Sequence, residues 1–301
     1  MAQRIVISEF MDAPAVESLR AGFDVEYGPQ LVDDPPALAA ALANADAWIV
    51  RNRTQVRGAA LAAAAKVRVV GRLGVGLDNI DLEACKARGI EVIPATGANA
   101  ESVAEYVVTM ALVLLRGAYH ATPAVAAGKW PRAKLSEGRE AKGKVLGLVG
   151  YGSIGRITAE KATALGMRVV THDPVVASPN ARTLEALLAE SDVVSLHMPL
   201  TPQTRGLLDA GRLALMKPDA VLINTARGGV LDEATLAAAL KAGKLGGAAL
   251  DVFDTEPLAA GSPLADAPNL VLTPHIAGVS KESNERVSSL IAERVADFLR
   301  R

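Results

Sequence analysis

The chain has 301 residues, which suggests about two domains, each large enough for its own hydrophobic core. Half of the residues are hydrophobic but only 3% are aromatic, so Ala, Val and Leu must fill the interior. The net charge is −1 and the charges are interspersed, which argues against nucleic acid or an anionic membrane surface as a partner. The single cysteine, Cys85, excludes an internal disulfide framework and fits a reducing compartment, so we expect a cytoplasmic protein.

The first 95 or so residues alternate strand and helix signals. We expect strands at 4–8, 47–50, 67–70 and 90–93, and helices at 14–20, 36–43 and 82–88. Alternation of this kind predicts a parallel sheet with helices on its faces. A long helix follows at 100–115, and its nearly apolar surface suggests burial between domains or subunits. Its most apolar part, 103–115, is too short to span a bilayer.

The stretch from 117 to 143 has weak periodicity, several charges and a Trp130-Pro131 pair. One interpretation is a solvated loop. The other is an arm that packs Trp130 into a partner subunit, and we favour it because large aromatic residues are scarce in this chain. The favoured interpretation predicts a homodimer.

A glycine-rich turn lies at the centre of the chain, between two predicted strands. The apolar run 145–149 leads into Gly150-Tyr-Gly152-Ser153-Ile154-Gly155, a helical stretch follows to Leu165, and 168–172 forms a second strand. Gly150 permits the tight turn, Gly152 lets a pyrophosphate approach the backbone, and Gly155 lets the helix pack on the strand. Strand, glycine triplet, helix and strand in this order predict a dinucleotide site at the helix N-terminus.

An acidic residue, Asp173, ends the second strand of this unit, eighteen residues after Gly155. Its carboxylate is placed to accept hydrogen bonds from a ribose diol. A 2′-phosphate would face a like charge there, so the cofactor predicted is NAD rather than NADP.

A second series of strands and helices continues to the end of the chain. We expect strands at 193–196, 220–224, 248–252 and 270–272, and helices at 184–190, 231–242 and 281–299. The strand series is complete before the last helix, so we expect that helix to return to the first domain. The predicted division is 1–96 with 281–301 for one domain and 97–280 for the other, the latter carrying a dimerisation arm at about 117–143.

Three charged residues follow successive strands of the second domain: Arg227, Glu256 and His275. In open α/β sheets this edge is where ligands bind. An acid, a histidine and an arginine beside a nicotinamide suit oxidation of a 2-hydroxy acid. The histidine can take the hydroxyl proton, the glutamate can orient the imidazole, and the arginine can clamp a carboxylate.

The motifs GYGSIG, NTARGG, DVFDTEP and TPHIAG, with VRNRT at 50–54 and GRLGVGLDNID at 71–81, resemble those of the D-2-hydroxyacid dehydrogenase family. The resemblance, closest to short phosphoglycerate dehydrogenase-like members, covers nearly the whole chain. It implies a Rossmann-type cofactor domain plus a flavodoxin-like substrate domain, both doubly wound parallel α/β sheets. It also implies that His275 is the general acid/base, Glu256 its partner and Arg227 the substrate clamp, with no metal.

The resemblance further implies two sets of binding residues. For NAD these are Gly150, Gly152, Ser153, Ile154, Gly155, Asp173, His197, Pro199, Thr204, Thr225, Ala226, Asp251 and Gly278. We expect His197 to line the pocket through its backbone and its imidazole to be structural. For the substrate they are Arg51, Arg53, Leu73, Gly74, Val75, Gly76 and Asn99, with backbone N–H groups around Gly74 binding the substrate carboxylate.

Arg51 and Arg53 bear on substrate choice, because residues two apart in an extended stretch share a face. Two guanidinium groups on one side suit a small 2-hydroxy or 2-oxo acid with a second anionic group. 3-Phosphoglycerate is the leading candidate and 3-sulfolactate a close second. A broad hydroxypyruvate or glyoxylate reductase remains if the two arginines are only surface residues.

A protein of another class, an NAD(H)-sensing binding protein, would keep the same fold and the same three charged residues. Such proteins usually carry disordered tails, and we expect none in this compact chain. The sequence leaves open the physiological direction, the pathway, the oligomer size and the strength of the preference for NAD.

Overall fold

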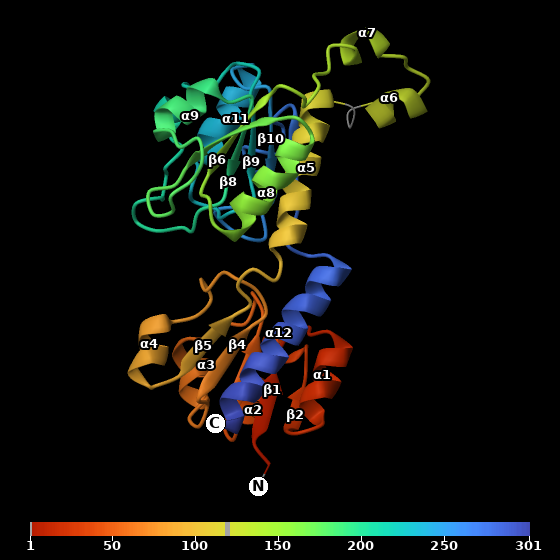
Figure 1. The fold of residues 1–301 in the computed structure, drawn as a ribbon. Helices are drawn as coiled ribbons and strands as arrows, with labels where there is room; N and C mark the ends of the chain where they lie inside the picture. Colours follow the sequence, from red (N-terminus) through yellow and green to blue (C-terminus); the bar gives the residue numbers. More distant parts are fainter. Residues whose placement is uncertain (1, 118–120) are drawn as a thin grey trace. The chain divides into compact units, whose positions relative to one another are not determined.

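The structure, a computed structural model, describes residues 2–117 and 121–301, and it divides into two compact units. One unit comprises Met1–Asn99 with Val279–Arg301, and the other comprises Ala100–Gly278. Each unit contains one sheet whose paired strands all run parallel, with helices on both faces (Figure 1). The expected fold class is confirmed.

The sheet of the first unit has the strand order β2-β1-β3-β4-β5, which is the flavodoxin-like order. Its strands are β1 (Arg4–Ile7), β2 (Asp24–Tyr27), β3 (Ala47–Val50), β4 (Val69–Arg72) and β5 (Glu91–Pro94). The helices are α1 (Ala13–Arg20), the short 3₁₀ helix η1 (Leu31–Asp33), α2 (Pro35–Leu42), α3 (Gly58–Ala63), α4 (Leu82–Ala87) and α12 (Lys281–Arg300).

Alternate residues of these strands enter two separate cores. Ile5, Ile7 and Ile49 pack with α1 and α12 on one face, whereas Val6 and Trp48 pack with α2, α3 and α4 on the other. This division follows from the two-residue period of a strand. Strands that are buried on both faces appear in the sequence as short apolar runs.

The last helix, α12, belongs to the first unit and packs on α1, β4 and β5. Four of its buried residues, Val287, Ile291, Val295 and Leu299, recur every four positions and form its apolar stripe. The helix lies so close to β4 that a Cβ at Gly71 would come 2.7 Å from a methyl group of Ile291. Helix α12, although distant in sequence from β4, is thereby fixed against this sheet near the carboxyl ends of its strands.

The sheet of the second unit has the order β7-β6-β8-β9-β10-β11. Its strands are β6 (Val145–Val149), β7 (Arg168–His172), β8 (Val193–Leu196), β9 (Val221–Asn224), β10 (Gly247–Leu250) and β11 (Leu270–Leu272). The helices are α5 (Ala100–Arg116), α6 (Ala121–Ala126), α7 (Arg132–Leu135), α8 (Ser153–Ala164), α9 (Leu184–Glu190), α10 (Ala210–Leu213) and α11 (Glu233–Lys241). Beyond β7, Thr171 pairs with Ala181 in a single parallel bridge, which stands where a further edge strand would lie.

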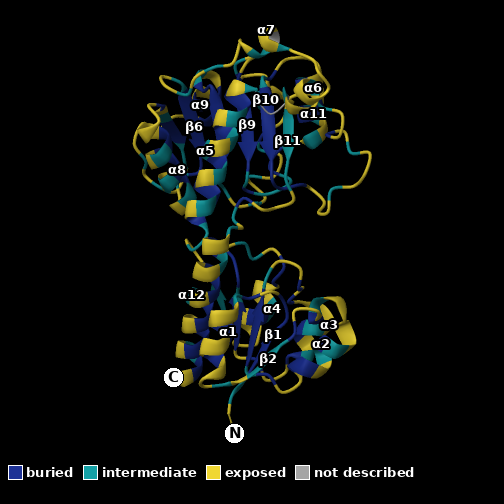
Figure 2. Cartoon of the chain, turned by 90° about the vertical axis from the view of Figure 1, so that its right-hand side faces the viewer, coloured by how far each residue is buried: buried dark blue, intermediate teal, exposed yellow. Residues whose placement is uncertain are grey.

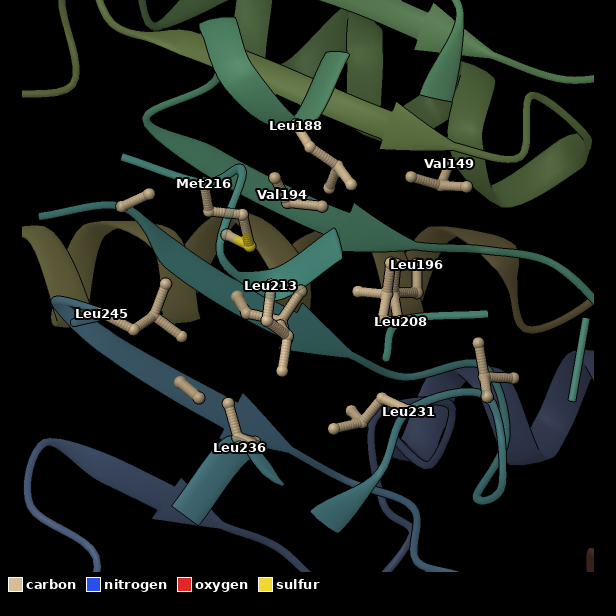
Figure 3. Packing of buried hydrophobic residues seen from close by; sticks show 14 of the residues in the cluster. Val149, Leu188, Val194, Leu196, Leu208, Leu213, Met216, Leu231, Leu236 and Leu245 are labelled. Carbon is tan, nitrogen blue, oxygen red and sulfur yellow. The ribbon is translucent and has the colours of Figure 1, made fainter. Parts of the chain in front are cut away.

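Two cores cover the faces of this second sheet. On one face Val194 and Leu196 of β8 meet Leu188 of α9, Leu213 of α10 and Leu236 of α11, and Figure 3 shows these side chains converging between strands and helices. On the opposite face α5 and α8 pack against the intervening strand residues. With both faces covered, the open edge at the carboxyl ends of the strands is left for ligands.

Some elements differ from the sequence prediction. Strand β2 was not predicted, because it is a partly exposed edge strand whose sequence, DVEY, interrupts its apolar residues with two acids. Helix α3 was also missed, and β4 lies two residues later than expected.

Helix α5 was expected to be nearly apolar and buried between domains or subunits. It carries exposed residues at 101, 105, 109 and 112, so it is amphipathic, and its buried face packs on α8, β9 and β10 of its own unit.

In its described residues, the stretch 117–143 contains the short helices α6 and α7 rather than a loop alone. Positions 118–120 of the predicted arm lie outside the described residues. Helix α6 has no buried residue and is mostly yellow in Figure 2, and Trp130 is 78% exposed.

Along the described residues, we find no helix with the length and apolarity needed to cross a membrane.

Candidate active site

The glycine turn after β6 leaves room for a ligand on one side only. Gly150 has a φ of +101°, and a Cβ there would lie 2.6 Å from the carbonyl oxygen of His197. A Cβ at Gly155 would lie 2.5 Å from the carbonyl oxygen of Gly150, whereas one at Gly152 would meet nothing within 4 Å. Helix α8 begins at Ser153 without a side-chain cap, so its first N–H groups can bind an anion. This arrangement fits a pyrophosphate.

Asp173 lies beside this turn, directly after β7. Its carboxylate accepts hydrogen bonds from the backbone N–H groups of Tyr151 (2.8 Å), Val175 (2.8 Å) and Val176 (2.9 Å). Burial alone would raise the pKa of Asp173, but these three hydrogen bonds outweigh it and hold the pKa below its usual value. A carboxylate has about four lone-pair sites, so an ionised acceptor remains for a ribose diol.

Several buried polar atoms at the ends of β8 and β9 lack a partner within the described part of the chain. They are both ring nitrogens of His197, the Thr225 hydroxyl and, inside β8, the Ser195 hydroxyl. Unpaired buried polar atoms are costly, and a bound polar ligand would satisfy those nearest the edge. Together with the glycine turn and Asp173, they fit a dinucleotide such as NAD.

His197 predicts a pH dependence of stability. Burial lowers the pKa of His197 to about 4 from 6.5, so the imidazole stays neutral in the fold. Below pH 6.5 the unfolded chain binds a proton that the folded chain does not, so stability is lost as the pH falls from 6.5 through 4. We expect this group alone to remove about 2.5 kcal/mol from the free energy of unfolding between pH 7.5 and pH 4.5.

Denaturant unfolding of the NAD-free protein at these two pH values, with a His197→Gln variant beside the wild type, checks this expectation. The glutamine does not titrate, so the variant should lose less stability than the wild type on acidification. Equal losses in the two proteins would refute it.

His275 and Glu256 form a hydrogen-bonded pair. The Nδ1 atom of His275 lies 2.8 Å from Oε2 of Glu256, and the other oxygen of Glu256 accepts a hydrogen bond from the backbone N–H of Phe253 (3.2 Å). With Nδ1 donating to the carboxylate, Nε2 is the ring nitrogen that can exchange a proton with a ligand. The expected acid–histidine pair is therefore assembled within the second unit.

The loop that carries His275 is fixed by a buried carboxylate. Oδ1 of Asp251 accepts hydrogen bonds from the Thr273 hydroxyl (2.6 Å) and the Ile276 N–H (2.8 Å), and Oδ2 accepts one from the Ala277 N–H (2.7 Å). His275 itself has a φ of +56°, a left-handed conformation that is rare for residues other than glycine. These three bonds hold that strained backbone in place.

Arg227 follows β9, next to the strand whose loop carries Glu256. Its backbone oxygen accepts a hydrogen bond from the Asn224 side chain (2.9 Å). The adjacent Gly228 lies so close to the neighbouring loop that a Cβ would come 1.9 Å from the carbonyl oxygen of Phe253, and the Gly229 N–H donates to the Asp254 carboxylate. The segments that carry Arg227 and Glu256 are thus locked together.

In the first unit, the segment after β3 is gathered around one buried carboxylate. Glu9 accepts hydrogen bonds from the backbone N–H groups of Arg51 (2.8 Å), Thr54 (2.9 Å) and Arg53 (3.1 Å). Asn79 donates to the carbonyl oxygens of Arg51 (3.0 Å) and Thr54 (2.7 Å). This segment is therefore bent rather than extended.

The bend changes the expectation that Arg51 and Arg53 act on one face. The Arg53 guanidinium pairs with Asp33, and both groups are well exposed. Arg51 is half-buried: its Nη2 donates to Oδ1 of Asn284 (2.7 Å) and its Cζ lies 5.7 Å from the centre of the Phe10 ring. Burial lowers the pKa of Arg51, although the Glu9 charge acts in the opposite sense. The structure gives the two guanidinium groups different partners.

The loop after β4 passes from buried residues, Leu73 and Gly74, to more exposed ones. Gly74 has a φ of +154°, and a Cβ there would lie 1.8 Å from Nη1 of Arg72, which donates to the Leu73 carbonyl oxygen (2.9 Å). Val75 is exposed and Gly76 is partly exposed. Oδ1 of Asn99 is buried without a hydrogen-bond partner among the described residues.

The remaining predicted cofactor residues take several positions in the second unit. The Thr204 hydroxyl donates to the Pro199 carbonyl oxygen (2.7 Å) and closes a turn after β8. Ala226 is buried beside Arg227, Ile154 packs on the core under α8, and Gly278 ends the loop of His275.

Sequence reasoning did not single out Glu9, Phe10 and Asn284, although an acid directly after a strand, as in Ser8-Glu9, is a usable signal.

Comparison with known proteins decides the family. A model described as "D-isomer specific 2-hydroxyacid dehydrogenase, NAD binding domain" matches residues 108–277. The chain is 51% identical over 299 residues to the (S)-sulfolactate dehydrogenase of Chromohalobacter salexigens, covering 97% of this chain and 96% of that protein. The chain belongs to the D-isomer specific 2-hydroxyacid dehydrogenase family. It is an NAD-dependent oxidoreductase, as the sequence predicted.

Two other relatives show how far the similarity extends. The D-3-phosphoglycerate dehydrogenase of Archaeoglobus fulgidus is 36% identical over 303 residues, which cover 98% of this chain but 57% of that protein. The chain thus spans a little over half the length of this relative. The crystal structure of the TT0316 protein from Thermus thermophilus matches with a TM-score of 0.91 at 36% identity, covering 99% of this chain and 97% of that one.

Proposed function

We propose that this D-2-hydroxyacid dehydrogenase acts on a three-carbon acid with a second anionic group, and that 3-sulfolactate is its substrate. The observation that carries the proposal is Arg51. Its guanidinium is half-buried, and no described residue forms an ion pair with it. A charge removed from water needs a counter-ion, and a sulfonate or phosphate on the substrate would supply one.

The 51% identity to an (S)-sulfolactate dehydrogenase supports a sulfonate in this position. The descriptor (S) agrees with a D-specific family. In sulfolactate the CH₂SO₃⁻ group ranks above the carboxylate because sulfur outranks oxygen, so the spatial arrangement that is (R) in D-lactate is named (S) in sulfolactate. The two names describe the same handedness at C2.

In the proposed reaction, C2 of the hydroxy acid loses a hydride and its hydroxyl loses a proton, which leaves a 2-oxo acid. Bound NAD would supply the hydride acceptor in this direction and the hydride donor in the reverse one. His275 takes the hydroxyl proton on Nε2, while Glu256 holds the ring through Nδ1 (2.8 Å) and stabilises the imidazolium that forms. Arg227 binds the C1 carboxylate and polarises the C2 oxygen, and backbone N–H groups near Gly74 add further donors.

For NAD itself, the proposed ligands are the α8 N-terminus for the pyrophosphate and Asp173 for the ribose diol. The polar atoms at the ends of β8 and β9 lie beside them. The hydride exchange belongs to the cofactor, whereas the chain binds, orients and moves the proton.

NADH oxidation against 3-sulfopyruvate, 3-phosphohydroxypyruvate, hydroxypyruvate, glyoxylate and pyruvate tests the proposal. We expect kcat/KM to favour a doubly anionic acid by about a hundredfold or more, which corresponds to about 2.7 kcal/mol. A flat profile that favours hydroxypyruvate or glyoxylate would contradict it and indicate a broad reductase. NADH binding without any turnover would indicate an NAD(H)-sensing binding protein instead.

3-Phosphoglycerate is the second candidate. A guanidinium recognises phosphate as well as sulfonate, and D-3-phosphoglycerate dehydrogenases such as that of Archaeoglobus fulgidus are similar over 98% of this chain. The same panel separates the two candidates by which doubly anionic acid has the higher kcat/KM.

We also propose that the enzyme is a cytoplasmic homodimer with the arm of residues 117–143 at its interface. The exposed Trp130 and Val125 support this proposal, because an uncovered tryptophan suits an interface better than water. Light scattering of the purified enzyme should give a mass of two chains, and a monomer would contradict the proposal.

A further inference from the structure

We propose that Asn284 determines the preference for a doubly anionic substrate by holding the Arg51 guanidinium with a neutral acceptor. Asn284 orients the guanidinium without cancelling its charge, so the charge remains available to the sulfonate or phosphate. This inference rests on the proposed function, in which Arg51 binds the second anionic group. It assigns a specificity-determining role to a residue of the last helix.

Asn284 is well placed for this task. It lies in the first turn of α12, which Ser280 caps by accepting a hydrogen bond from the Ser283 N–H (3.0 Å). The Asn284 N–H donates to the Ser280 carbonyl oxygen (2.9 Å), so its backbone is fixed. Its Oδ1 lies 2.7 Å from Nη2 of Arg51, and its side chain is half-buried.

Among the described residues, no carboxylate forms a direct ion pair with the Arg51 guanidinium. The Phe10 ring, 5.7 Å from Cζ, contacts the guanidinium but carries no net charge. The negative charge of Glu9 also acts on Arg51, but the Glu9 oxygens bind three backbone N–H groups, and no direct ion pair between Glu9 and the guanidinium is found among the described residues. A guanidinium has five N–H donors, and Asn284 takes one of them, so donors remain for a bidentate anion.

Arg53 provides an internal comparison, two residues along the same bent segment. Its guanidinium is paired with the carboxylate of Asp33 in solvent. A carboxylate at position 284 would bring Arg51 into the same state, in which the arginine already has its counter-ion. The amide at 284 is therefore the feature that gives the half-buried Arg51 a neutral partner, whereas the exposed Arg53 has a charged one.

The test compares Asn284→Asp with Asn284→Gln and with Ser289→Asp. Asn284→Asp is nearly isosteric and adds one charge, Asn284→Gln keeps a neutral acceptor, and Ser289→Asp adds the same charge at an exposed position of the same helix. Kinetics with 3-sulfopyruvate and glyoxylate are measured for each variant, with NADH affinity and Tm as checks on folding.

We expect Asn284→Asp to lower kcat/KM for 3-sulfopyruvate by about thirtyfold or more, mainly through KM, and to leave glyoxylate within about threefold. Asn284→Gln should lose less than about fivefold, and Ser289→Asp should change neither substrate. An unchanged KM for 3-sulfopyruvate in Asn284→Asp, or an equal loss for glyoxylate, would overturn the inference. If Asn284→Asp does not fold, a loss of more than about fivefold in Asn284→Gln that is equal for glyoxylate and 3-sulfopyruvate would overturn it.

The wild-type enzyme separates this inference from the proposed function. If the wild type itself shows no preference for a doubly anionic acid, the proposed function has failed. If the preference is present but insensitive to Asn284→Asp, only the role of Asn284 has failed.

Discussion

His275→Ala lowers kcat by about 10²–10⁴-fold on the best 2-oxo acid, because it removes the group that exchanges a proton with the C2 oxygen. NADH affinity should stay within about twofold, since the dinucleotide ligands proposed above lie elsewhere in the second unit. Steady-state kinetics at saturating NADH, with NADH fluorescence titration, measure both quantities.

Glu256→Gln is the companion variant for this prediction. Glutamine can still accept a hydrogen bond from Nδ1 of His275, but it cannot stabilise an imidazolium by charge, so its loss should be smaller than that of His275→Ala. Turnover close to that of the wild type in His275→Ala would contradict the assignment of the acid/base.

Arg51→Gln lowers kcat/KM for the preferred doubly anionic acid by about a hundredfold, the value expected when a charge-assisted bidentate contact is lost. Glyoxylate has no second anionic group, so its kcat/KM should change little. The measurement is kcat/KM for both acids in the variant and the wild type.

Arg53→Gln is the matched control, since it removes the same charge two positions away. Arg53 is paired with Asp33 in solvent, and exposed ion pairs contribute little, so we expect an effect within about threefold for both acids. Equal losses in Arg51→Gln and Arg53→Gln would restore the idea of two cooperating guanidinium groups and contradict the separation seen in the structure.

The parts that sequence predicted correctly depend on local pattern. Strands β6 and β8 were placed without error because strands that are buried on both faces are uninterrupted apolar runs. The pairing of Glu256 and His275 was accessible because the two residues follow strands β10 and β11, which are neighbours in both sequence and sheet. Adjacent parallel strands bring the residues after them to the same edge.

The parts that sequence missed depend on contacts between distant residues. Spacing alone put Arg51 and Arg53 on one face, but Glu9, more than forty positions earlier, bends the segment between them. The partner of Arg51, Asn284, is 233 positions away in the chain. Edge strand β2 was missed for another reason, since a partly exposed strand with two acids has no apolar run to detect.

The central claim is that the enzyme oxidises a D-configured, doubly anionic 2-hydroxy acid with NAD. Oxidation of racemic 3-sulfolactate with NAD tests it most directly, with the oxo product trapped by semicarbazide and the residual acid resolved by chiral chromatography. We predict NADH formation that stops when the (S) enantiomer is consumed, with the (R) enantiomer left intact. Consumption of the (R) enantiomer, or an enzyme that oxidises D-glycerate with NAD but leaves both enantiomers of sulfolactate untouched, would contradict the account.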